Sequence, residues 1–257
     1  MRELSPVSRR EFLRLGTLAG LTAATGATVV LPKKRVDAGR LEFRPHKATK
    51  TTSPGEYVLA DEEGRRTLLY VPPTYDPSKP APFLLALHGA TGSGESMLRG
   101  TRPAAEKHGV IVLAPSSRDF TWDAIRGTFS VDFVRIDKTL SAVFDQCAID
   151  PRRLGVVGFS DGATYALSVG LINGDIFTHI IGHSAGFIVP GPVHGRPKVY
   201  LSHGHQDTVL PFDQCGRRIA DQLTHQAYVL RFDEFEGGHA ASPEIREAAM
   251  SWFVGEG

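Results

Sequence analysis

Two pentapeptides of the chain place a serine between glycines, and a serine hydroxyl can attack the carbonyl carbon of an ester, thioester or amide. They are Gly158-Phe159-Ser160-Asp161-Gly162 and Gly182-His183-Ser184-Ala185-Gly186. Both match the pattern G-x-S-x-G, in which the serine sits on a sharp turn between a strand and a helix and glycine avoids side-chain clashes. Because glycine and serine are common residues, the neighbouring sequence must decide which serine is the nucleophile.

The sequence around the first pentapeptide favours Ser160. An apolar run, Leu154–Val157, can form the preceding strand, and Ala163–Leu167 can form a following helix that lies close to the sheet. After Ser184 comes Phe187–Pro192, where prolines prevent a helix from starting. We therefore predict that Ser160 is the nucleophile and that Ser184 ends the next strand, close to the substrate pocket.

A serine nucleophile needs a base beside it and a third group that orients the base. Where G-x-S-x-G joins a strand to a helix, the chain order is serine, then an acid, then histidine. Asp207 follows the apolar run Val199–Ser202, and His239 follows the last predicted strand. Sites in parallel sheets assemble at the carboxyl ends of strands, so we predict His239 as the base and Asp207 as its partner. Three other acids fit the order less well: Asp213, Asp233 and Glu236.

The segment Leu87–Gly94 is rich in glycine and follows a predicted strand. A tetrahedral intermediate carries a negative oxygen that fixed N–H donors must hold. One donor in this arrangement is the N–H after the nucleophile, here Asp161, and the other lies in the loop after the third strand. We predict Ala90 as the second donor, with Thr91 as the alternative. A phosphate-binding loop is excluded because no lysine follows the last glycine.

Three residues are candidates for the walls of the substrate pocket: Thr91, Trp122 and Ser184. Trp122 lies in a long loop, residues 115–131, after a predicted strand. Its indole could line an acyl or aromatic pocket or fill the core. Both interpretations fit the sequence equally.

The chain has ten histidines, so a metal site has to be considered. His203 and His205 would share one face of a strand. A catalytic zinc site needs a third protein ligand and an open position, and no matching cluster accompanies this pair. We predict neither a metal site nor any other cofactor.

Short apolar runs alternate with amphipathic helical patterns between residue 39 and the C-terminus. The first two runs, Tyr57–Ala60 and Thr67–Val71, predict a hairpin. The repeated strand-then-helix order predicts an α/β fold with a mostly parallel, doubly wound sheet and helices on both faces. The segment of residues 185–197 leaves no room for a large lid domain. The other predicted strands are Phe83–Leu87, Val110–Leu113, Arg153–Val157, His179–Gly182, Lys198–Ser202 and Val229–Phe232.

Three helical patterns stand out along the chain: Phe133–Phe144, Asp213–His225 and Pro243–Phe253. The first places apolar residues on one face, as a helix that packs on a sheet requires. Asp132 stands near its start, and we expect its carboxylate to cap free N–H groups there.

The chain has 257 residues, of which 41% are hydrophobic and 22% charged, and this suits one globular catalytic domain, residues 39–257. The net charge of +1 gives no electrostatic argument for nucleic-acid binding. Two cysteines are too few for a disulfide scaffold. Cys147 and Cys215 are expected at opposite ends of the sheet, so we predict that they are unpaired. The composition does not indicate an oligomeric state.

Residues 1–38 are expected to be an export signal. Ser8–Arg14 resembles the bacterial twin-arginine motif, the uncharged stretch Leu15–Leu31 follows it, and Val36-Asp37-Ala38 offers small residues for cleavage. Retention as a membrane anchor is the alternative, but the stretch is only weakly apolar. We predict a periplasmic or extracellular protein with no integral membrane association after signal removal.

The chain from Gly55 onward resembles the lidless α/β-hydrolases, in particular the phospholipase/carboxylesterase group and the polyhydroxybutyrate-depolymerase or feruloyl-esterase-like secreted esterases. This resemblance implies hydrolysis of a small-molecule or polymeric carboxylic ester without a cofactor. Asp161 departs from the asparagine, glutamine or methionine that is commoner beside the nucleophile, which alters the charge expected in the pocket. The matching segments are Leu69–Pro73, Leu87–Gly89, Asp150–Arg153, Gly158–Gly162, His203–Gly204 with Asp207, Pro211–Phe212, and Gly238–His239.

Two alternatives to an esterase stay open. The same serine, acid and histidine serve peptidases and thioesterases. A protein with a hydrolase scaffold could also bind a ligand without catalysis, although the complete order of the three residues argues against this.

Overall fold

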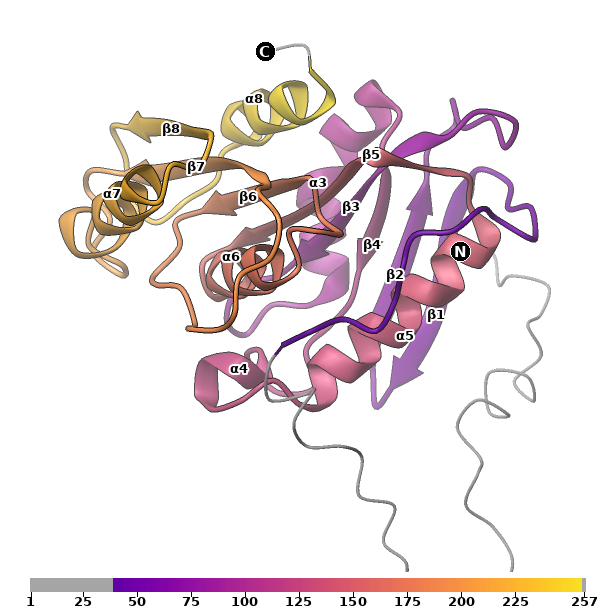
Figure 1. The fold of residues 1–257 in the computed structure, drawn as a ribbon, viewed down its shortest axis with the longest axis horizontal. Coiled ribbons are helices and arrows are strands. Elements are labelled where there is room, and N and C mark those ends of the chain that lie inside the picture. The colour runs from indigo at the N-terminus through magenta and orange to yellow at the C-terminus, as the bar shows by residue number, and fades with distance from the viewer. Residues whose placement is uncertain (1–38, 256–257) are drawn as a thin grey trace, which may run out of the picture.

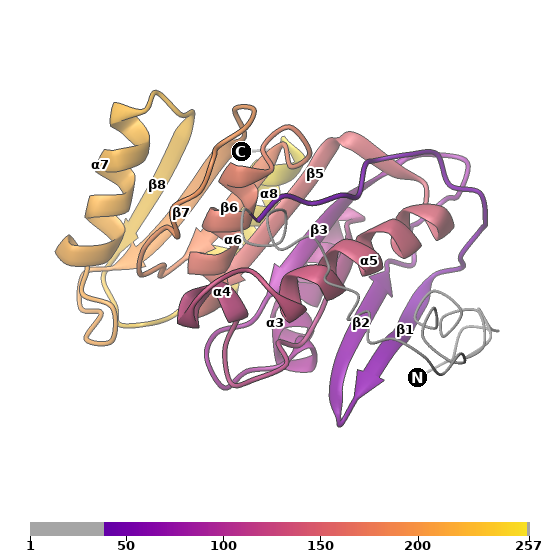
Figure 2. The same ribbon diagram turned by 60° about the horizontal axis from the view of Figure 1, so that its bottom comes forward.

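A computed structural model describes residues 39–255, which include an eight-stranded sheet in the order β1-β2-β4-β3-β5-β6-β7-β8 (Figure 1 and Figure 2). β2 is antiparallel to both of its neighbours, and all the other pairs are parallel. The predicted mostly parallel sheet with its N-terminal hairpin is therefore confirmed. The strands are β1 Gly55–Glu62, β2 Arg65–Val71, β3 Ala81–Leu87, β4 Ile111–Ala114, β5 Ile149–Phe159, β6 His179–His183, β7 Lys198–Gly204 and β8 Leu230–Phe235.

Helices cover both faces of the sheet and bury a separate apolar layer on each (Figure 1). One layer includes side chains of α5, α6 and α7, and the other includes side chains of α3 and α8. Strands covered on both faces need apolar residues on both sides, which explains the continuous runs in the sequence. The helices are α3 Gly94–His108, α4 Asp123–Arg126, α5 Val131–Gln146, α6 Asp161–Ile172, α7 Arg218–His225 and α8 Pro243–Val254.

The predicted helices are present, with two differences in detail. A π-helical turn, Asp213–Arg217, precedes α7 and takes up the first part of the predicted helix. The prediction that Asp132 caps α5 is wrong. The N–H groups of Ser130, Asp132 and Phe133 donate to the carboxylate of Asp123. The carboxylate of Asp132 instead accepts the N–H groups of Arg118 and Asp123, because the loop before α5 folds back over it.

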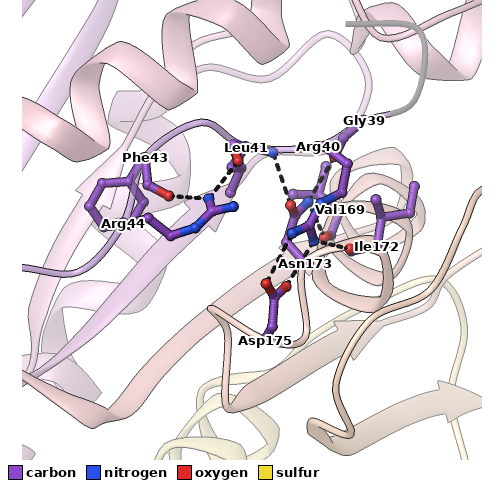
Figure 3. A network of polar contacts seen from close by, with 9 residues as sticks. All are labelled: Gly39, Arg40, Leu41, Phe43, Arg44, Val169, Ile172, Asn173 and Asp175. Carbon is purple, nitrogen blue, oxygen red and sulfur yellow. Dashed lines mark hydrogen bonds and ion pairs between the residues drawn. The ribbon is translucent and has the colours of Figure 1, made fainter. Parts of the chain in front are cut away.

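An N-terminal strap, residues 39–52, crosses the helices on the α5 and α6 side. Leu41 and Phe43 of the strap are buried in the core. The side chain of Asn173, which follows α6, accepts the N–H of Leu41 at 2.9 Å and donates to the carbonyl of Gly39 at 2.8 Å (Figure 3). Arg40 makes a bidentate ion pair with Asp175 and also donates to Ile172. The strap is therefore fixed to the end of the helix that begins beside Ser160.

The predicted signal, residues 1–38, lies outside the described residues. Within residues 39–255, no helix is long and apolar enough to cross a membrane. The segment of residues 185–197 contains no helix, in agreement with the absence of a large lid domain. Cys147 and Cys215 are both buried and unpaired.

Candidate active site

Ser160 occupies the turn between β5 and α6 with φ 55° and ψ −121°. A positive φ is strained for a residue with a side chain, and such strain is typical of functional turns. The glycines on either side allow the chain to pass so closely. A Cβ on Gly158 would lie 2.0 Å from the carbonyl oxygen of Gly162, and one on Gly162 would lie 2.1 Å from that of Leu87. The turn thus requires the glycines of the pentapeptide.

His239 and Asp207 meet Ser160 at the carboxyl edge of the sheet. Nε2 of His239 lies 2.9 Å from Oγ of Ser160, and its Nδ1 lies 2.7 Å from Oδ2 of Asp207. The three side chains come from the turn after β5, the loop after β7 and the loop after β8. The carboxylate fixes the proton on Nδ1, which leaves Nε2 free to accept the hydroxyl proton.

The carboxylate of Asp207 is buried and fully bonded. Oδ1 accepts the N–H groups of Val209 at 2.9 Å and Leu210 at 2.8 Å. Burial by itself raises the pKa of Asp207, but the N–H of Leu210, the His239 imidazole and the N–H of Val209 outweigh it and hold the pKa below its usual value. Asp207 therefore stays ionised beside the imidazole at neutral pH.

His203, which the sequence placed in a segment that resembles the α/β-hydrolases and for which a metal site was not predicted, lies behind this acid. Its Nε2 is 2.7 Å from the carbonyl oxygen of Leu210 and 3.2 Å from Oδ2 of Asp207. A carbonyl only accepts, so Nε2 carries the proton and supports the loop that holds Asp207. Within residues 39–255, no group of three or more His, Cys, Asp or Glu side chains is arranged so that it could hold a metal ion.

The N–H of Ala90 is oriented by the other end of its own peptide. The carbonyl of Gly89 accepts Nδ1–H of His88 at 2.7 Å and the N–H of Gly92 at 3.0 Å. In a trans peptide the N–H points opposite to the C=O, so these two bonds turn the N–H of Ala90 away from the loop. A Cβ on Gly89 would lie 3.2 Å from Cβ of Ser160, which places this peptide against the Ser160 side chain.

The N–H of Asp161 is oriented in the same way, by hydrogen bonds to the carbonyl at the other end of its peptide. The carbonyl of Ser160 accepts the N–H groups of Ala163 at 2.9 Å and Thr164 at 3.0 Å, so the N–H of Asp161 points out of α6. Within the described residues, neither this N–H nor that of Ala90 donates to an acceptor. Two unused donors beside one hydroxyl are suited to hold an oxyanion.

Of the three candidates for the pocket walls, Thr91 alone has an exposed side chain. The N–H of Thr91 donates to the carbonyl of Phe120 at 2.6 Å, so it is not a free oxyanion donor, although its side chain is exposed. Trp122 has no exposed surface and donates to the carbonyl of His88 at 2.8 Å, so it is a core indole and not a pocket wall. Ser184 is also fully buried, and its Oγ lies 3.3 Å from the carbonyl of Ala240. A substrate reaches neither Trp122 nor Ser184.

The alternative acids are engaged away from His239. Asp213 pairs with Arg217, Asp233 accepts the Tyr200 hydroxyl, and Glu236 contacts Gln206. Asp207 is thus the acid that contacts the imidazole.

Three exposed apolar side chains lie on loops that follow strands of the parallel part of the sheet. Phe120 is 56% exposed, Phe187 38% and Val209 63%, and they follow β4, β6 and β7 at the edge of the sheet where Ser160 lies. We call these three residues the apolar rim. Large apolar side chains exposed together at a site indicate a surface for an apolar ligand.

Thr121 and His88 also contribute hydrogen bonds beside the site, which the sequence did not predict. Oγ1 of Thr121 donates to Oδ2 of Asp161 at 2.5 Å, and Thr121 is 2% exposed. Nε2 of His88 accepts the N–H of Ser117 at 2.9 Å, so its proton lies on Nδ1. Burial lowers the pKa of His88 to about 4 and keeps the ring neutral. His88 stood in a recognised motif, but Thr121 has no local signal because its partner lies 40 residues away.

No protein-family model matches the chain. It is 26% identical to a probable feruloyl esterase C of Aspergillus oryzae over 213 residues, which covers 70% of this chain and 77% of that protein. It is 29% identical to a putative esterase, NocK, of Nocardia uniformis subsp. tsuyamanensis, over 84% of this chain and 69% of that one. The solved structure of esterase PE8 superposes with a TM-score of 0.58 and 19% identity, over 72% of this chain and 96% of that one. The chain therefore has the α/β-hydrolase fold, and its sequence relatives are named as esterases, which supports hydrolysis of carboxylic esters.

Proposed function

We propose that the chain hydrolyses carboxylic esters through an acyl-enzyme formed on Ser160. The observation that carries this proposal is the line of two short contacts, Ser160 Oγ to His239 Nε2 and His239 Nδ1 to Asp207 Oδ2. The strained backbone at Ser160 and the two unused N–H groups beside it support the same reaction.

In the first half-reaction, Oγ of Ser160 forms a bond to the ester carbonyl carbon while its proton passes to Nε2 of His239. The carbonyl π electrons move to the oxygen, which accepts hydrogen bonds from the N–H groups of Ala90 and Asp161. Asp207 orients the imidazole and stabilises its positive charge. When the tetrahedral intermediate collapses, the C–O bond to the alcohol breaks and the leaving oxygen takes the proton from Nε2.

In the second half-reaction, a water molecule replaces the alcohol. It gives a proton to His239 while its oxygen attacks the acyl carbon, and a second tetrahedral intermediate forms on the same N–H groups. Collapse returns the proton to Oγ of Ser160 and releases the carboxylic acid. The neutral enzyme is restored without a cofactor.

The proposed substrate is an ester with an apolar or aromatic group. The apolar rim supports this choice, because Phe120, Phe187 and Val209 offer exposed apolar surface on loops at the edge of the sheet where Ser160 lies. Relatives that are named feruloyl esterases make feruloyl esters the first compounds to test. Small and polymeric esters both fit an active site with no large lid.

We also propose that residues 1–38 direct export by the twin-arginine route and that residues 39–257 form the catalytic domain. The strap supports this boundary, since Gly39 and Leu41 are already bonded to Asn173. A fusion of residues 1–38 to a reporter that is active only after folded export tests it, with Arg9→Lys and Arg10→Lys together as the variant expected to stay inside the cell.

The decisive experiment is labelling of the full chain by a serine-directed fluorophosphonate, read by intact mass. One adduct should form on the wild type and none on Ser160→Ala, whose kcat on short aryl esters should fall by ~10³-fold or more. Ser184→Ala, the matched change in the second pentapeptide, should still be labelled. Retention of kcat by Ser160→Ala would refute the proposal, and turnover of peptides or thioesters in preference to esters would replace the substrate class.

A further inference from the structure

Three consecutive residues, Phe120, Thr121 and Trp122, each make one polar bond toward the proposed oxyanion hole. The carbonyl of Phe120 accepts the N–H of Thr91 at 2.6 Å. Oγ1 of Thr121 donates to Oδ2 of Asp161 at 2.5 Å. Nε1 of Trp122 donates to the carbonyl of His88 at 2.8 Å.

These bonds reach both halves of the hole. His88 and Thr91 flank Ala90 in the loop after β3, whereas Asp161 begins α6 after β5. The two N–H donors therefore come from separate segments of the chain, and one short stretch is bonded to both segments. An oxyanion hole works only if its donors keep their distance from the developing charge, to within about 0.5 Å.

Ring packing ties the same two segments together. The Trp122 indole lies between His88, with ring centroids 4.8 Å apart, and Tyr165 of α6, with centroids 5.2 Å apart. Trp122 is fully buried and Thr121 is 2% exposed, so water does not compete for their bonds. The hydroxyl of Tyr165 donates in turn to Asp123, the next residue along, at 2.9 Å.

The bond from Thr121 also accounts for an acid at position 161. A carboxylate beside a developing oxyanion would oppose it electrostatically. Its contact with Thr121 fixes one oxygen of this carboxylate on the side of the 115–131 loop. The residue can then supply its N–H to the oxyanion while its side chain is held by another segment.

We infer that Phe120–Trp122 acts as a clamp that holds the N–H groups of Ala90 and Asp161 in register for the oxyanion. This inference rests on the proposed function, since it assumes that these two N–H groups bind the tetrahedral intermediate. Thr121 and Trp122 are positioning residues, because neither reaches the substrate. The clamp should therefore affect stabilisation of the transition state, whereas the apolar rim should affect binding of the substrate.

Thr121→Val tests the clamp, because it keeps the shape of the side chain and removes the hydroxyl. We expect kcat to fall ~10–100-fold with KM within about twofold. Affinity for an alkyl boronic acid, which forms a tetrahedral adduct on serine, should fall by a similar factor. Thr121→Ser should restore both values. Trp122→Phe, which keeps an aromatic ring but loses Nε1–H and part of the packing surface, should lower kcat and boronic acid affinity together.

Thr139→Val is the matched control, since Thr139 is a buried threonine of α5 whose hydroxyl donates to the carbonyl of Arg135. It should keep wild-type kcat and boronic acid affinity. Active-site titration with the fluorophosphonate normalises each rate to folded enzyme. If Thr121→Val and Trp122→Phe keep wild-type kcat and boronic acid affinity while Ser160→Ala is inactive, the clamp is refuted and the proposed function stands. If Ser160→Ala is active, the proposed function fails and the clamp with it.

Discussion

Asp123 and Asp132 bind each other's backbone. Oδ2 of Asp123 accepts the N–H of Asp132 at 2.9 Å, and Oδ2 of Asp132 accepts the N–H of Asp123 at 3.0 Å. Asp132 also accepts the N–H of Arg118, so its carboxylate bonds to both ends of the segment that carries Phe120, Thr121 and Trp122. Asp123 accepts a further bond from the buried hydroxyl of Tyr165, so the pair also connects the loop to α6.

Replacement of Asp123 by alanine should therefore destabilise the whole protein. It would leave the N–H groups at the start of α5 and the Tyr165 hydroxyl without their acceptor, and buried polar groups without partners are costly. We expect the free energy of unfolding in urea to fall by about 3 kcal/mol. Asp119→Ala, which removes an acid with a side chain 67% exposed, should change it by less than about 0.5 kcal/mol. Equal effects of the two variants would contradict this role of Asp123.

Stability should decrease with acidity between pH 6.5 and about 4. Burial lowers the pKa of His88 and His179 to about 4 and that of His183 to about 3. The unfolded chain then binds protons that the folded chain does not, so the stability present above pH 6.5 is lost as the pH falls. Asp132, Asp137 and His46 act in the opposite sense, because their pKa values are raised, that of Asp132 to about 6, but we expect the three buried histidines to outweigh them.

His179→Gln tests this pH dependence away from the active site. His179 is 9% exposed and packs against Trp252 and Phe253. Urea unfolding measured from pH 7 to 4.5 should show a slope that is smaller by up to ~1.4 kcal/mol per pH unit in this variant. The exposed His194 is the control, and His194→Gln should keep the wild-type slope. An unchanged slope in His179→Gln would exclude His179 as a source of acid sensitivity.

Much of the fold could be predicted because strands that are buried on both faces appear in the sequence as continuous apolar runs. Each continuous apolar run became a strand to within a few residues. Helix α3 was not predicted, since Gly100 and Pro103 interrupt its pattern. At Gly100 the helix packs closely against a side chain far along the chain, since a Cβ there would lie 1.9 Å from the guanidinium of Arg246 in α8. Such contacts between distant elements leave no local signal.

The order of Ser160, Asp207 and His239 followed from the chemistry of serine hydrolases and from the ends of strands. The side chains that surround these residues could not be predicted in the same way. Trp122 was equally consistent with a pocket wall and a core residue, and the choice depended on His88 and Tyr165, which come from two other segments. Which acid caps α5 likewise depended on how the preceding loop folds back.

The strap should contribute to stability mainly through Asn173. Its side chain is fully buried and bonds to Leu41, Gly39 and Val169. Asn173→Ala should lower the free energy of unfolding by about 2–3 kcal/mol, because two strap groups lose their partners. Arg40→Ala should cost about 1 kcal/mol or less, since its ion pair with Asp175 is partly exposed. Urea unfolding of both variants checks this order, and a larger effect of Arg40→Ala would reverse it.

The apolar rim should affect KM more than kcat. Phe120→Ala should raise KM for aromatic and long-chain esters about 5–10-fold, because roughly 1–1.5 kcal/mol of apolar contact is lost, and should leave acetate esters almost unchanged. The backbone bond from Phe120 to Thr91 remains in this variant. Val229→Ala is the matched control, since Val229 is 67% exposed and precedes β8 at the opposite edge of the sheet. An equal rise in KM for acetate and aromatic esters would show that Phe120 does not select the substrate.

Asp207→Asn should lower kcat by ~10³–10⁴-fold with little change in KM. An asparagine can present its amide N–H to Nδ1, which would move the imidazole proton to Nε2 and remove the acceptor for the Ser160 hydroxyl. Fluorophosphonate labelling should slow by a similar factor, because it needs the same activated hydroxyl. Asp213→Asn changes an exposed acid that pairs with Arg217, and this control should keep wild-type rates. If the Asp213 variant lost activity and the Asp207 variant did not, the wrong acid would have been assigned to His239.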